Sequence, residues 1–430
     1  MPFETFGQPP RRVAIVGGGI SGMAAAYMLA GTHAVTLFEA APQLGGHART
    51  ITAGKRGDQP VDTGFIVFNK VNYPHLLAMF ERLEVPIAPS DMGFGASIAG
   101  GRVQYALRNL NSLFAQRRNA LSPRFLRMIS DILHFNAHAE AALSPELTIG
   151  ALLQSLGTSA AFRDHYITPI SGAIWSTPPE GILDFPAEAM IRFFKNHALM
   201  QTSEQHQWYT VRGGSVEYVR RLQAHLVRQG AELRTNTPVA ALRREANGVL
   251  LRPHGAEWEL YDDVILATHS DDTLAMLTDV SPAERAALSA VRYQPNDAIL
   301  HADPAAMPTN RRAWASWVYV EPQGPKPDRI ALTYWMNSLQ PIPQDDPLFV
   351  TLNPTAPIRQ ELVYDQTTFR HPVFNHATLA AQGAIRAMNG TRNTWFCGAW
   401  MKNGFHEDGF ASAVDVAQAI AARAAQKAAA

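Results

Sequence analysis

The chain has 430 residues, and its 37 Lys and Arg residues balance its 37 Asp and Glu residues, so the formal net charge at pH 7 is +0. This balance gives no overall positive field for a nucleic acid, and we expect none as a partner. The single cysteine, Cys397, excludes an intrachain disulfide framework and a cysteine-rich metal site, and it favours a cytoplasmic location. No apolar run reaches the roughly twenty residues of a membrane-spanning helix, and the length is enough for two domains.

The most informative segment begins with Arg12–Val16, an apolar run that predicts a β-strand. A G-x-G-x-x-G pattern follows, in which Gly17 permits a tight turn, Gly19 lets a pyrophosphate approach the backbone, and Gly22 lets the next helix pack against the strand. Glu39 ends a second apolar run, where its carboxylate can accept hydrogen bonds from an adenosine ribose. Strand, glycines, helix and acid together predict a dinucleotide-binding βαβ unit.

The remaining pattern predicts two interleaved domains. We assign residues 1–75, 205–290 and 390–430 to the nucleotide-binding domain, and residues 76–204 and 291–389 to a substrate domain. The first insertion is mostly helical, and the second, which is rich in Pro, Trp and Tyr, predicts an antiparallel sheet.

Three local patterns predict individual elements. Apolar residues at helical spacing predict a short amphipathic helix over 76–83 and a longer one over 216–226, with Ser215 as the N-terminal cap of the second. Residues 394–398 predict a final buried strand, and an alanine-rich helix is expected to begin at Gly409.

The order of the motifs resembles that of the flavin-dependent amine oxidase and phytoene desaturase superfamily. The motifs that carry the resemblance are Gly17–Gly22, Glu39, the Leu44-Gly45-Gly46 loop with Arg49 and Thr50, the Gly213-Gly214 turn, and the terminal Phe396-Cys397-Gly398 and Asp408-Gly409 segments. The resemblance implies an α/β fold, in which a discontinuous Rossmann-like FAD-binding domain is interleaved with an α+β substrate domain of the amine oxidase type. It also implies FAD, which we expect to be bound without a covalent link.

The resemblance further implies how FAD is held: the phosphates on the first glycine loop, the ribose on Glu39, the flavin against the second glycine loop, and the last helix near the flavin. Val239 matches a position whose backbone touches adenine. The implied contacts are Gly17, Gly19, Ile20, Ser21, Gly22, Glu39, Gly45, Gly46, His47, Arg49, Val239, Gly398, Glu407, Asp408 and Gly409.

Two departures from the superfamily pattern concern the cofactor. His47 stands where most relatives have an arginine, so Arg49 is a candidate to supply that charge. Ala399 stands where an acidic residue usually binds the ribityl chain, so Glu407 or Asp408 is a candidate replacement.

His406 and Glu407 are the candidate catalytic residues, because they form a polar cluster beside an expected flavin contact. Each could take a substrate proton or only bind ribityl hydroxyls, whereas Asp408 is better explained as a helix cap. The candidate substrate cavity residues, which could equally be ordinary core, are Trp175, His197, Tyr334 and Trp335.

The segments 193–197 and 400–409 resemble a bacterial branch that includes desaturases of methyl-branched fatty acyl chains in furan fatty acid synthesis. Residues 296–301 match the strand that carries a lysine behind the flavin in amine oxidases, and they contain none. We therefore expect dehydrogenation of a fatty acyl or other lipid-like substrate by hydride transfer to flavin N5. The alternatives are an amine oxidase, a flavin-dependent double-bond isomerase, and a flavin-binding protein without turnover.

Residues 92–130 contain six arginines and no Asp or Glu, with apolar residues between them. Such a segment can lie on an anionic membrane, which here would be the inner surface of the cytoplasmic membrane. The alternative is a surface that is solvated or that contacts another subunit. The oligomeric state does not follow from the sequence.

Overall fold

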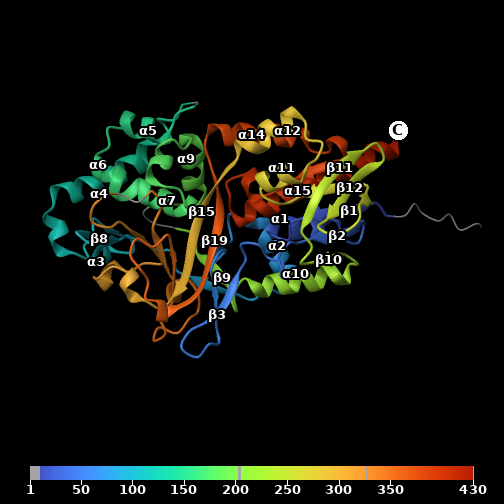
Figure 1. Ribbon diagram of the computed structural model, residues 1–430. Coiled ribbons are helices and arrows are strands. Elements are labelled where there is room, and N and C mark those ends of the chain that lie inside the picture. Colours follow the sequence, from blue (N-terminus) through green and yellow to red (C-terminus); the bar gives the residue numbers. More distant parts are fainter. Residues whose placement is uncertain (1–9, 145, 202–204, 326–327, 430) are drawn as a thin grey trace, which may run out of the picture.

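The structure is a computed structural model that describes residues 10–144, 146–201, 205–325 and 328–429 (Figure 1). A five-stranded sheet, parallel throughout, carries the predicted βαβ unit in the order β10-β2-β1-β14-β20. Its strands are β1 (Arg12–Val16), β2 (Ala34–Phe38), β10 (Glu232–Arg234), β14 (Asp263–Leu266) and β20 (Thr394–Phe396). Val13 to Val16 are all buried, as expected for a central parallel strand covered on both faces.

Helices cover this sheet. The helix α1 (Ile20–Leu29) packs against α15 (His406–Ala429) and α10 (Val216–Arg228), so the first and last helices lie side by side. A small antiparallel sheet and three helices lie beyond the sheet's other face: β11 (Val239–Glu245), β12 (Gly248–Pro253), β13 (Glu259–Tyr261), α11 (Ser270–Met276), α12 (Pro282–Ala290) and α14 (His376–Met388).

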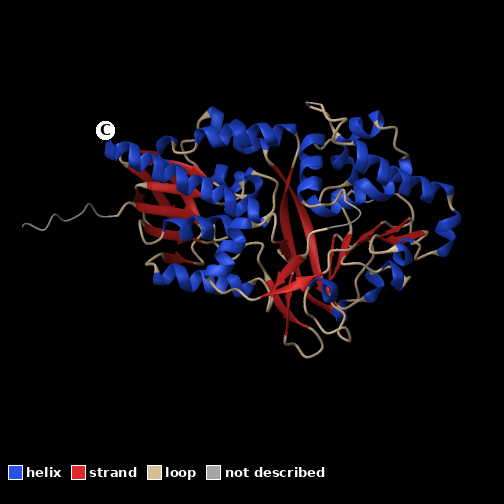
Figure 2. Cartoon of the chain, turned by 180° about the vertical axis from the view of Figure 1, so that it is seen from behind, coloured by secondary structure: helices blue, strands red, loops and turns tan. Residues whose placement is uncertain are grey.

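A seven-stranded sheet forms the centre of the other half, in the order β19-β15-β18-β17-β16-β7-β8. Its strands are β7 (Phe94–Ile98), β8 (Val103–Ala106), β15 (Arg292–His301), β16 (Trp317–Val320), β17 (Leu332–Trp335), β18 (Phe349–Leu352) and β19 (Val363–Val373). Figure 2 shows the long central strands between the layered parallel sheet and a mainly helical region. The antiparallel pairing of β15 to β19 confirms the expected sheet, although β7 and β8 from the first insertion complete it.

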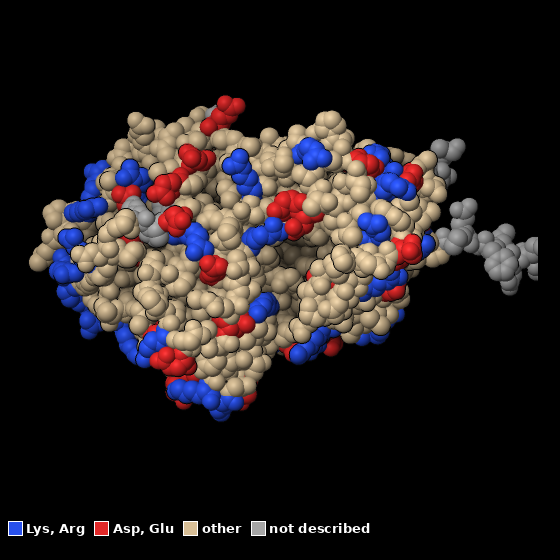
Figure 3. All heavy atoms as spheres, viewed as in Figure 1, with Lys and Arg blue, Asp and Glu red and all other residues tan. Residues whose placement is uncertain are grey.

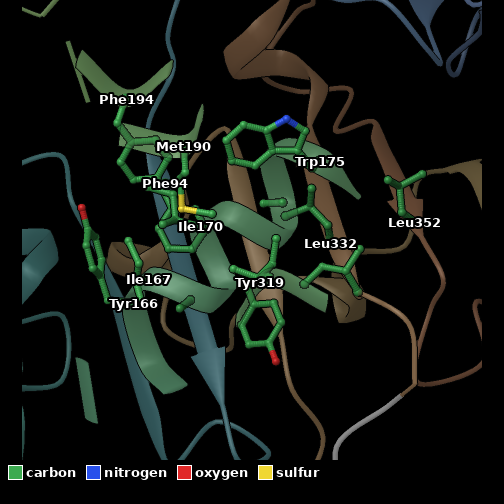
Figure 4. Close-up of a cluster of buried hydrophobic side chains, with 14 of the residues drawn as sticks. Phe94, Tyr166, Ile167, Ile170, Trp175, Met190, Phe194, Tyr319, Leu332 and Leu352 are labelled. Carbon is green, nitrogen blue, oxygen red and sulfur yellow. The ribbon is translucent and has the colours of Figure 1, made fainter. Parts of the chain in front are cut away.

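The helical region lies against this sheet and consists of α3 (Leu110–Leu113), α4 (Pro123–His138), α5 (Ile149–Ser155), α6 (Ala160–Phe162), α7 (Thr168–Trp175), α8 (Pro179–Leu183) and α9 (Ala187–Asn196). Figure 4 shows Ile170 and Trp175 of α7 beside Met190 of α9 and Leu332 of β17. This apolar core joins the two insertions and forms one wall of the cavity described below.

Short sheets connect the two halves. They are β3 (Thr50–Ala53) with β4 (Gln59–Asp62), and β9 (Trp208–Val211) between β5 (Val67–Asn69) and β6 (Ile87–Ser90). The strand β6 belongs to the first insertion and pairs with β9, which follows that insertion. The start and the end of the insertion are therefore joined by a direct contact between strands. The expected boundary at 204 and 205 adjoins residues 202–204, which lie outside the described ranges.

The helices predicted from local patterns are confirmed only in part. The short helix is confirmed as α2 (Pro74–Arg82). A further short helix, α13 (Met336–Leu339), follows β17. Ser215 does not cap α10 with its side chain, because its hydroxyl donates to Asp62 instead. The last helix begins at His406 rather than Gly409, since Asp408 already lies in its first turn.

None of the helices in the described ranges combines the length with the apolar character that a bilayer crossing requires.

Candidate functional site

The first glycine loop has the geometry of a phosphate cradle. Gly17 has a φ of +106°, and a side chain at Gly22 would lie 1.8 Å from the Gly17 carbonyl oxygen, so both positions require glycine. Gly19, by contrast, faces open space, with its nearest neighbouring atom in Gly46 at 4.0 Å. The first turn of α1 carries no acidic residue and no capping side chain, which leaves its main-chain N–H groups, including those of Ile20 and Ser21, for an anion.

Glu39 lies at the edge of this loop. Its Oε2 accepts a 2.6 Å hydrogen bond from the Gly18 amide and its Oε1 a 2.8 Å bond from the Ala41 amide. Each carboxylate oxygen keeps a further lone pair, so both can accept from ribose hydroxyls. The Thr237 amide donates to the Glu39 carbonyl at 2.9 Å, which brings the segment that leads to Val239 against the same loop.

The second glycine loop touches the first. The Gly45 amide donates to the Gly18 carbonyl at 2.9 Å, and a side chain at Gly46 would lie 3.1 Å from the Cα of Gly19. His47 follows, and its Nε2 is buried without a hydrogen-bond partner among the described residues. A buried polar atom of this kind is costly unless another group satisfies it, which fits a cofactor beside the two loops.

Arg49 does not take the place of the missing arginine. Its guanidinium donates to both carboxylate oxygens of Asp365, at 2.6 and 3.0 Å, and ties the start of β3 to β19. Its side chain does not line the cavity. The expectation that Arg49 supplies charge to the cofactor is corrected, because a paired guanidinium has little charge left to offer.

A cavity of about 360 Å³ extends from the glycine loops into the half of the molecule that contains the seven-stranded sheet. Gly19, Gly46 and Gly398 line one end, and Figure 3 shows a hollow between the two halves of the molecule. The other end is mostly aliphatic and aromatic, with walls that include Phe94, Ile170, Trp175, Phe193, Phe374 and Phe405. The described residues that line the cavity include no Asp, Glu or Lys.

Arg370 is the only Lys or Arg among those lining residues, and it is neutralised. It pairs with Asp271 at 2.7 Å and with Asp272, and its Nη2 also donates to Nδ1 of His269 at 3.1 Å. The ligand atoms of His269, Asp271 and Asp272 lie within 4.8 Å of one another. The guanidinium bonds to all three residues, so an arginine, and not a metal ion, already neutralises this group.

Five histidines of the described chain line the cavity: His47, His197, His269, His371 and His406. Burial lowers the pKa of the first three to about 4, and burial lowers the pKa of His371 and His406 to about 3. All five are therefore neutral at pH 7, and each carries one N–H and one lone pair on its ring nitrogens.

A chain of hydrogen bonds fixes the tautomer of His371. The Asp297 amide donates to Oδ1 of Asn353 at 3.0 Å, so Nδ2 of Asn353 must be the donor that reaches Oδ1 of Asn296 at 2.7 Å. Nδ2 of Asn296 then donates to Nδ1 of His371 at 3.0 Å. Because Nδ1 accepts, the proton of the neutral ring lies on Nε2, and His371 is a hydrogen-bond donor.

The same reasoning shows which ring nitrogen donates and which accepts in the other histidines. Arg370 donates to Nδ1 of His269, so His269 is also an Nε2–H donor. Nδ1 of His197 faces the Phe193 carbonyl at 3.0 Å and must donate to it, which leaves the lone pair on Nε2. His406 stacks on Phe65, and its Nε2 is occupied by the Tyr218 hydroxyl at 2.6 Å.

Glu407 and Asp408 serve helices rather than the cavity. The Glu407 carboxylate accepts from the amides of His75 and Leu76 at the start of α2, both at 3.0 Å, and it does not line the cavity. Burial raises its pKa to about 7. Asp408 accepts from the Phe405 amide at 2.9 Å and caps α15, and burial raises its pKa to about 6. The hypothesis that Glu407 faces the substrate is corrected, because both its oxygens bind a helix terminus.

Tyr334 and Trp335 lie on opposite faces of β17, because successive side chains of a strand alternate. Tyr334 lines the cavity, as do Trp175 and His197. Trp335 instead packs edge-on against Trp314, with ring centroids 5.3 Å apart. Its assignment to the cavity is corrected, and its role is core packing.

Sequence reasoning missed Asn296, His269, Arg370 and His371. His269 could have been found, because it follows β14 at the carboxyl edge of the parallel sheet, where ligands of such folds bind. The other three lie on β15 and β19, and no local motif marks them. Only the antiparallel pairing of these two strands brings Asn296 to His371 at the cavity wall.

The parallel sheet, the two glycine loops and the adjoining cavity define a flavoprotein oxidoreductase. The chain belongs to the flavin-containing amine oxidoreductase family, whose model matches residues 20–308, and its cofactor is FAD. The glycine loops, Glu39 and the unpartnered Nε2 of His47 fit that cofactor.

The individual proteins that resemble this chain match it over a short segment or at low sequence identity. An L-amino-acid oxidase from Sistrurus catenatus edwardsii is 57% identical over 42 residues, which span 10% of this chain and only 8% of that protein. A fatty acid isomerase from P. acnes that produces CLA has a TM-score of 0.70 at 17% identity, over 95% of this chain and 98% of that one. Cyclohexylamine oxidase from Brevibacterium oxydans has a TM-score of 0.69 at 16% identity, over 96% and 99%. At these identities the two structures establish the fold alone.

Proposed function

We propose that the protein dehydrogenates an acyl chain or another lipid-like substrate with FAD as the oxidant. The observation that carries this proposal is the composition of the cavity, whose described lining residues include no Asp, Glu or Lys. Burying one methylene group gains about 0.8 kcal/mol, so an apolar chain is favoured by such walls. An ammonium group would lose its hydration there without meeting a carboxylate.

Different residues of the chain would position the substrate, exclude water and move the proton. FAD, when bound, supplies a hydride acceptor at N5. The aliphatic and aromatic walls position the substrate and exclude water. The Nε2–H groups of His269 and His371 are available to donate hydrogen bonds to a substrate, whereas Nε2 of His197 keeps a lone pair that can accept the proton released with the hydride. The substrate thus loses one hydride and one proton, and a C=C bond forms.

Amine oxidation is the second candidate, because it is the reaction named in the description of the family. Two observations weigh against it. The strand β15, Arg292–His301, contains no lysine, and no carboxylate among the described lining residues faces a bound ammonium. Double-bond isomerisation would use the same apolar cavity without net reduction of the cofactor.

Anaerobic reduction of the bound flavin separates these reactions. The purified holoprotein is mixed with a membrane phospholipid extract, with free fatty acids, or with a panel of primary amines and polyamines, and flavin absorbance is followed. We expect bleaching by a lipid and, by mass analysis, a product with two hydrogens fewer. Bleaching by amines alone would overturn the proposal, and a rearranged lipid of unchanged mass without bleaching would indicate isomerisation.

The same sample tests how FAD is attached. Cys397 is buried at the end of β20 and does not line the cavity, so we expect acid to release FAD intact from the denatured chain. Flavin that stays on the polypeptide would contradict this expectation.

A further inference from the structure

We propose that one edge of the substrate domain docks on the surface of an anionic lipid bilayer. The edge comprises the turn between β7 and β8, α3, the short 3-10 helix Arg117–Leu121, and α4. We call it the arginine-leucine surface, and its exposed side chains are Arg102, Arg117, Arg118, Arg124, Arg127, Leu107, Leu110, Leu121, Leu126 and Leu133. This docking does not depend on the proposed reaction.

The arginines of this surface are largely without carboxylate partners. Within the described part of the chain, Arg102, Arg117, Arg118 and Arg124 form no ion pair, and only Arg127 does, with Asp131 at 2.9 Å. Residues 92–130 contain no Asp or Glu. In Figure 3, Lys and Arg line the edge of the molecule where Figure 1 labels α4, β8 and α3. Positive charge that the protein does not balance can be balanced by anionic headgroups.

Exposed leucines accompany these charges. Leu110, Leu121 and Leu133 keep 74%, 87% and 54% of their surface in solvent. Leu126 and Leu133 are seven residues apart on α4, two helical turns, so they share one face. Residues 107–133 contribute half of the large apolar side chains that are exposed in the described chain. Apolar side chains beside cations can insert at the boundary between headgroups and acyl chains, whereas a nucleic acid would offer the leucines little.

The arginine-leucine surface is continuous with the cavity wall. Gly93 and Phe94 line the cavity, and β7 leads from Phe94 to the turn that carries Arg102. Arg108 lies across Gly93, where an added side chain would meet its Cγ at 3.0 Å. Docking would therefore bring this wall of the cavity towards the bilayer, which would suit a substrate that cannot leave the membrane.

Vesicle co-sedimentation of the holoprotein tests the inference. The vesicles are phosphatidylglycerol mixed with phosphatidylcholine, or phosphatidylcholine alone, at low and high salt. The test variant carries R102Q, R117Q, R118Q and R124Q. The control carries R56Q, R220Q, R228Q and R285Q, exposed arginines elsewhere, so both variants lose the same charge. A second variant, with Leu110, Leu121 and Leu133 changed to serine, tests the apolar contribution.

We expect the wild type and the control to bind anionic vesicles and to release them at high salt. Each basic residue near an anionic surface strengthens binding by about fivefold, so the test variant should bind at least about tenfold more weakly. The leucine variant should bind more weakly at both salt concentrations. Equal binding of test and control variants would overturn the proposal, as would binding that ignores anionic lipid. Loss of self-association in the test variant, without any lipid effect, would assign the surface to contacts between copies. The flavin spectrum reports that each variant is folded.

Discussion

At the scale of single residues, hydrogen-bond direction gives the cavity its chemistry. His371 and His197 are both neutral rings in an apolar cavity, yet they present opposite groups to it. A main-chain amide at Asp297 fixes one ring through Asn353 and Asn296, and a main-chain carbonyl at Phe193 fixes the other. Backbone groups cannot reverse their roles, so neither ring is free to exchange tautomers.

This assignment predicts a result that needs no substrate. In long-range 1H–15N NMR spectra at pH 7, His371 should be the Nε2–H tautomer and His197 the Nδ1–H tautomer. Asn296→Leu removes the group that donates to Nδ1 of His371, so His371 should then populate both tautomers while His197 keeps its own. An Nδ1–H signal from His371 in the wild type would contradict the assignment.

Kinetics then test the role of His197. If its Nε2 accepts the substrate proton, His197→Ala should slow anaerobic flavin reduction by about 10²-fold or more, with FAD affinity unchanged. His206→Ala is the matched control, because His206 bonds to the Asn196 carbonyl nearby and does not line the cavity. Equal rates in the two variants would leave His197 a packing residue.

Residue-scale prediction from sequence succeeds where function depends on one local turn. Gly17 and Gly22 could be predicted, because the constraints that select glycine arise within a few residues of each other. His371 could not, because its partner Asn296 is 75 positions away and reaches it only through strand pairing. Trp335 was misassigned for a related reason: a strand's sequence shows that neighbours alternate, but not which of its faces meets the cavity.

At the scale of secondary structure elements, Glu407 connects the last helix to α2. Tyr73, at the N-cap of α2, offers no capping side chain, and the Glu407 carboxylate accepts from two first-turn amides in its place. A remote carboxylate can thus perform the work of an N-cap residue, and it also interacts favourably with the helix dipole.

Glu407→Ala should therefore lower the free energy of unfolding by about 0.5 to 2 kcal/mol, the usual effect of losing an N-cap, and leave the rate of flavin reduction nearly unchanged. Urea unfolding and anaerobic reduction of the holoprotein measure the two effects. Glu81→Ala is the control, because Glu81 is exposed on α2 itself. A large fall in reduction rate at unchanged stability would restore Glu407 as a catalytic residue.

Element boundaries show why such caps are hard to predict. The sequence predicts that α15 begins at Gly409, because Asp408 looks like an N-cap residue. In the structure, Asp408 is the third residue of the helix and reaches back to the Phe405 amide, so the helix starts at His406. An acidic residue satisfies an orphan amide from either position, and local sequence does not distinguish them.

At the scale of the whole molecule, the two insertions are one structure. The strands β7 and β8 come from the first insertion and complete the sheet of the second, and the helices between them cover that sheet. The α/β class and the parallel sheet could be predicted, because each βαβ unit has local periodicity. The joining of two insertions could not, since β7 and β16 are more than 200 residues apart and pair without any shared motif.

The whole molecule also has a predictable response to acid. The five cavity histidines and the buried His301 have pKa values lowered to about 3 or 4 by burial, whereas burial raises the pKa of Asp62 and Asp408 to about 6 and that of Glu407 to about 7. At pH 6 Glu407 is mostly protonated in the fold and Asp62 and Asp408 are about half protonated, and by pH 5 all three are protonated. In the unfolded chain the six histidines are protonated and these acids are not.

For these nine groups, the unfolded chain therefore binds about three more protons than the folded chain between pH 6 and 4.5. Their contribution lowers the free energy of unfolding as the pH falls, by up to about 4 kcal/mol per pH unit. Above about pH 7.5 the histidines are neutral in both states and contribute no slope. Urea unfolding of the holoprotein at several pH values measures the trend. His301→Gln, which lies outside the cavity, should make the slope shallower by about one proton. A stability that stays level from pH 6 to 4.5 would mean that the histidines are not held neutral by the fold.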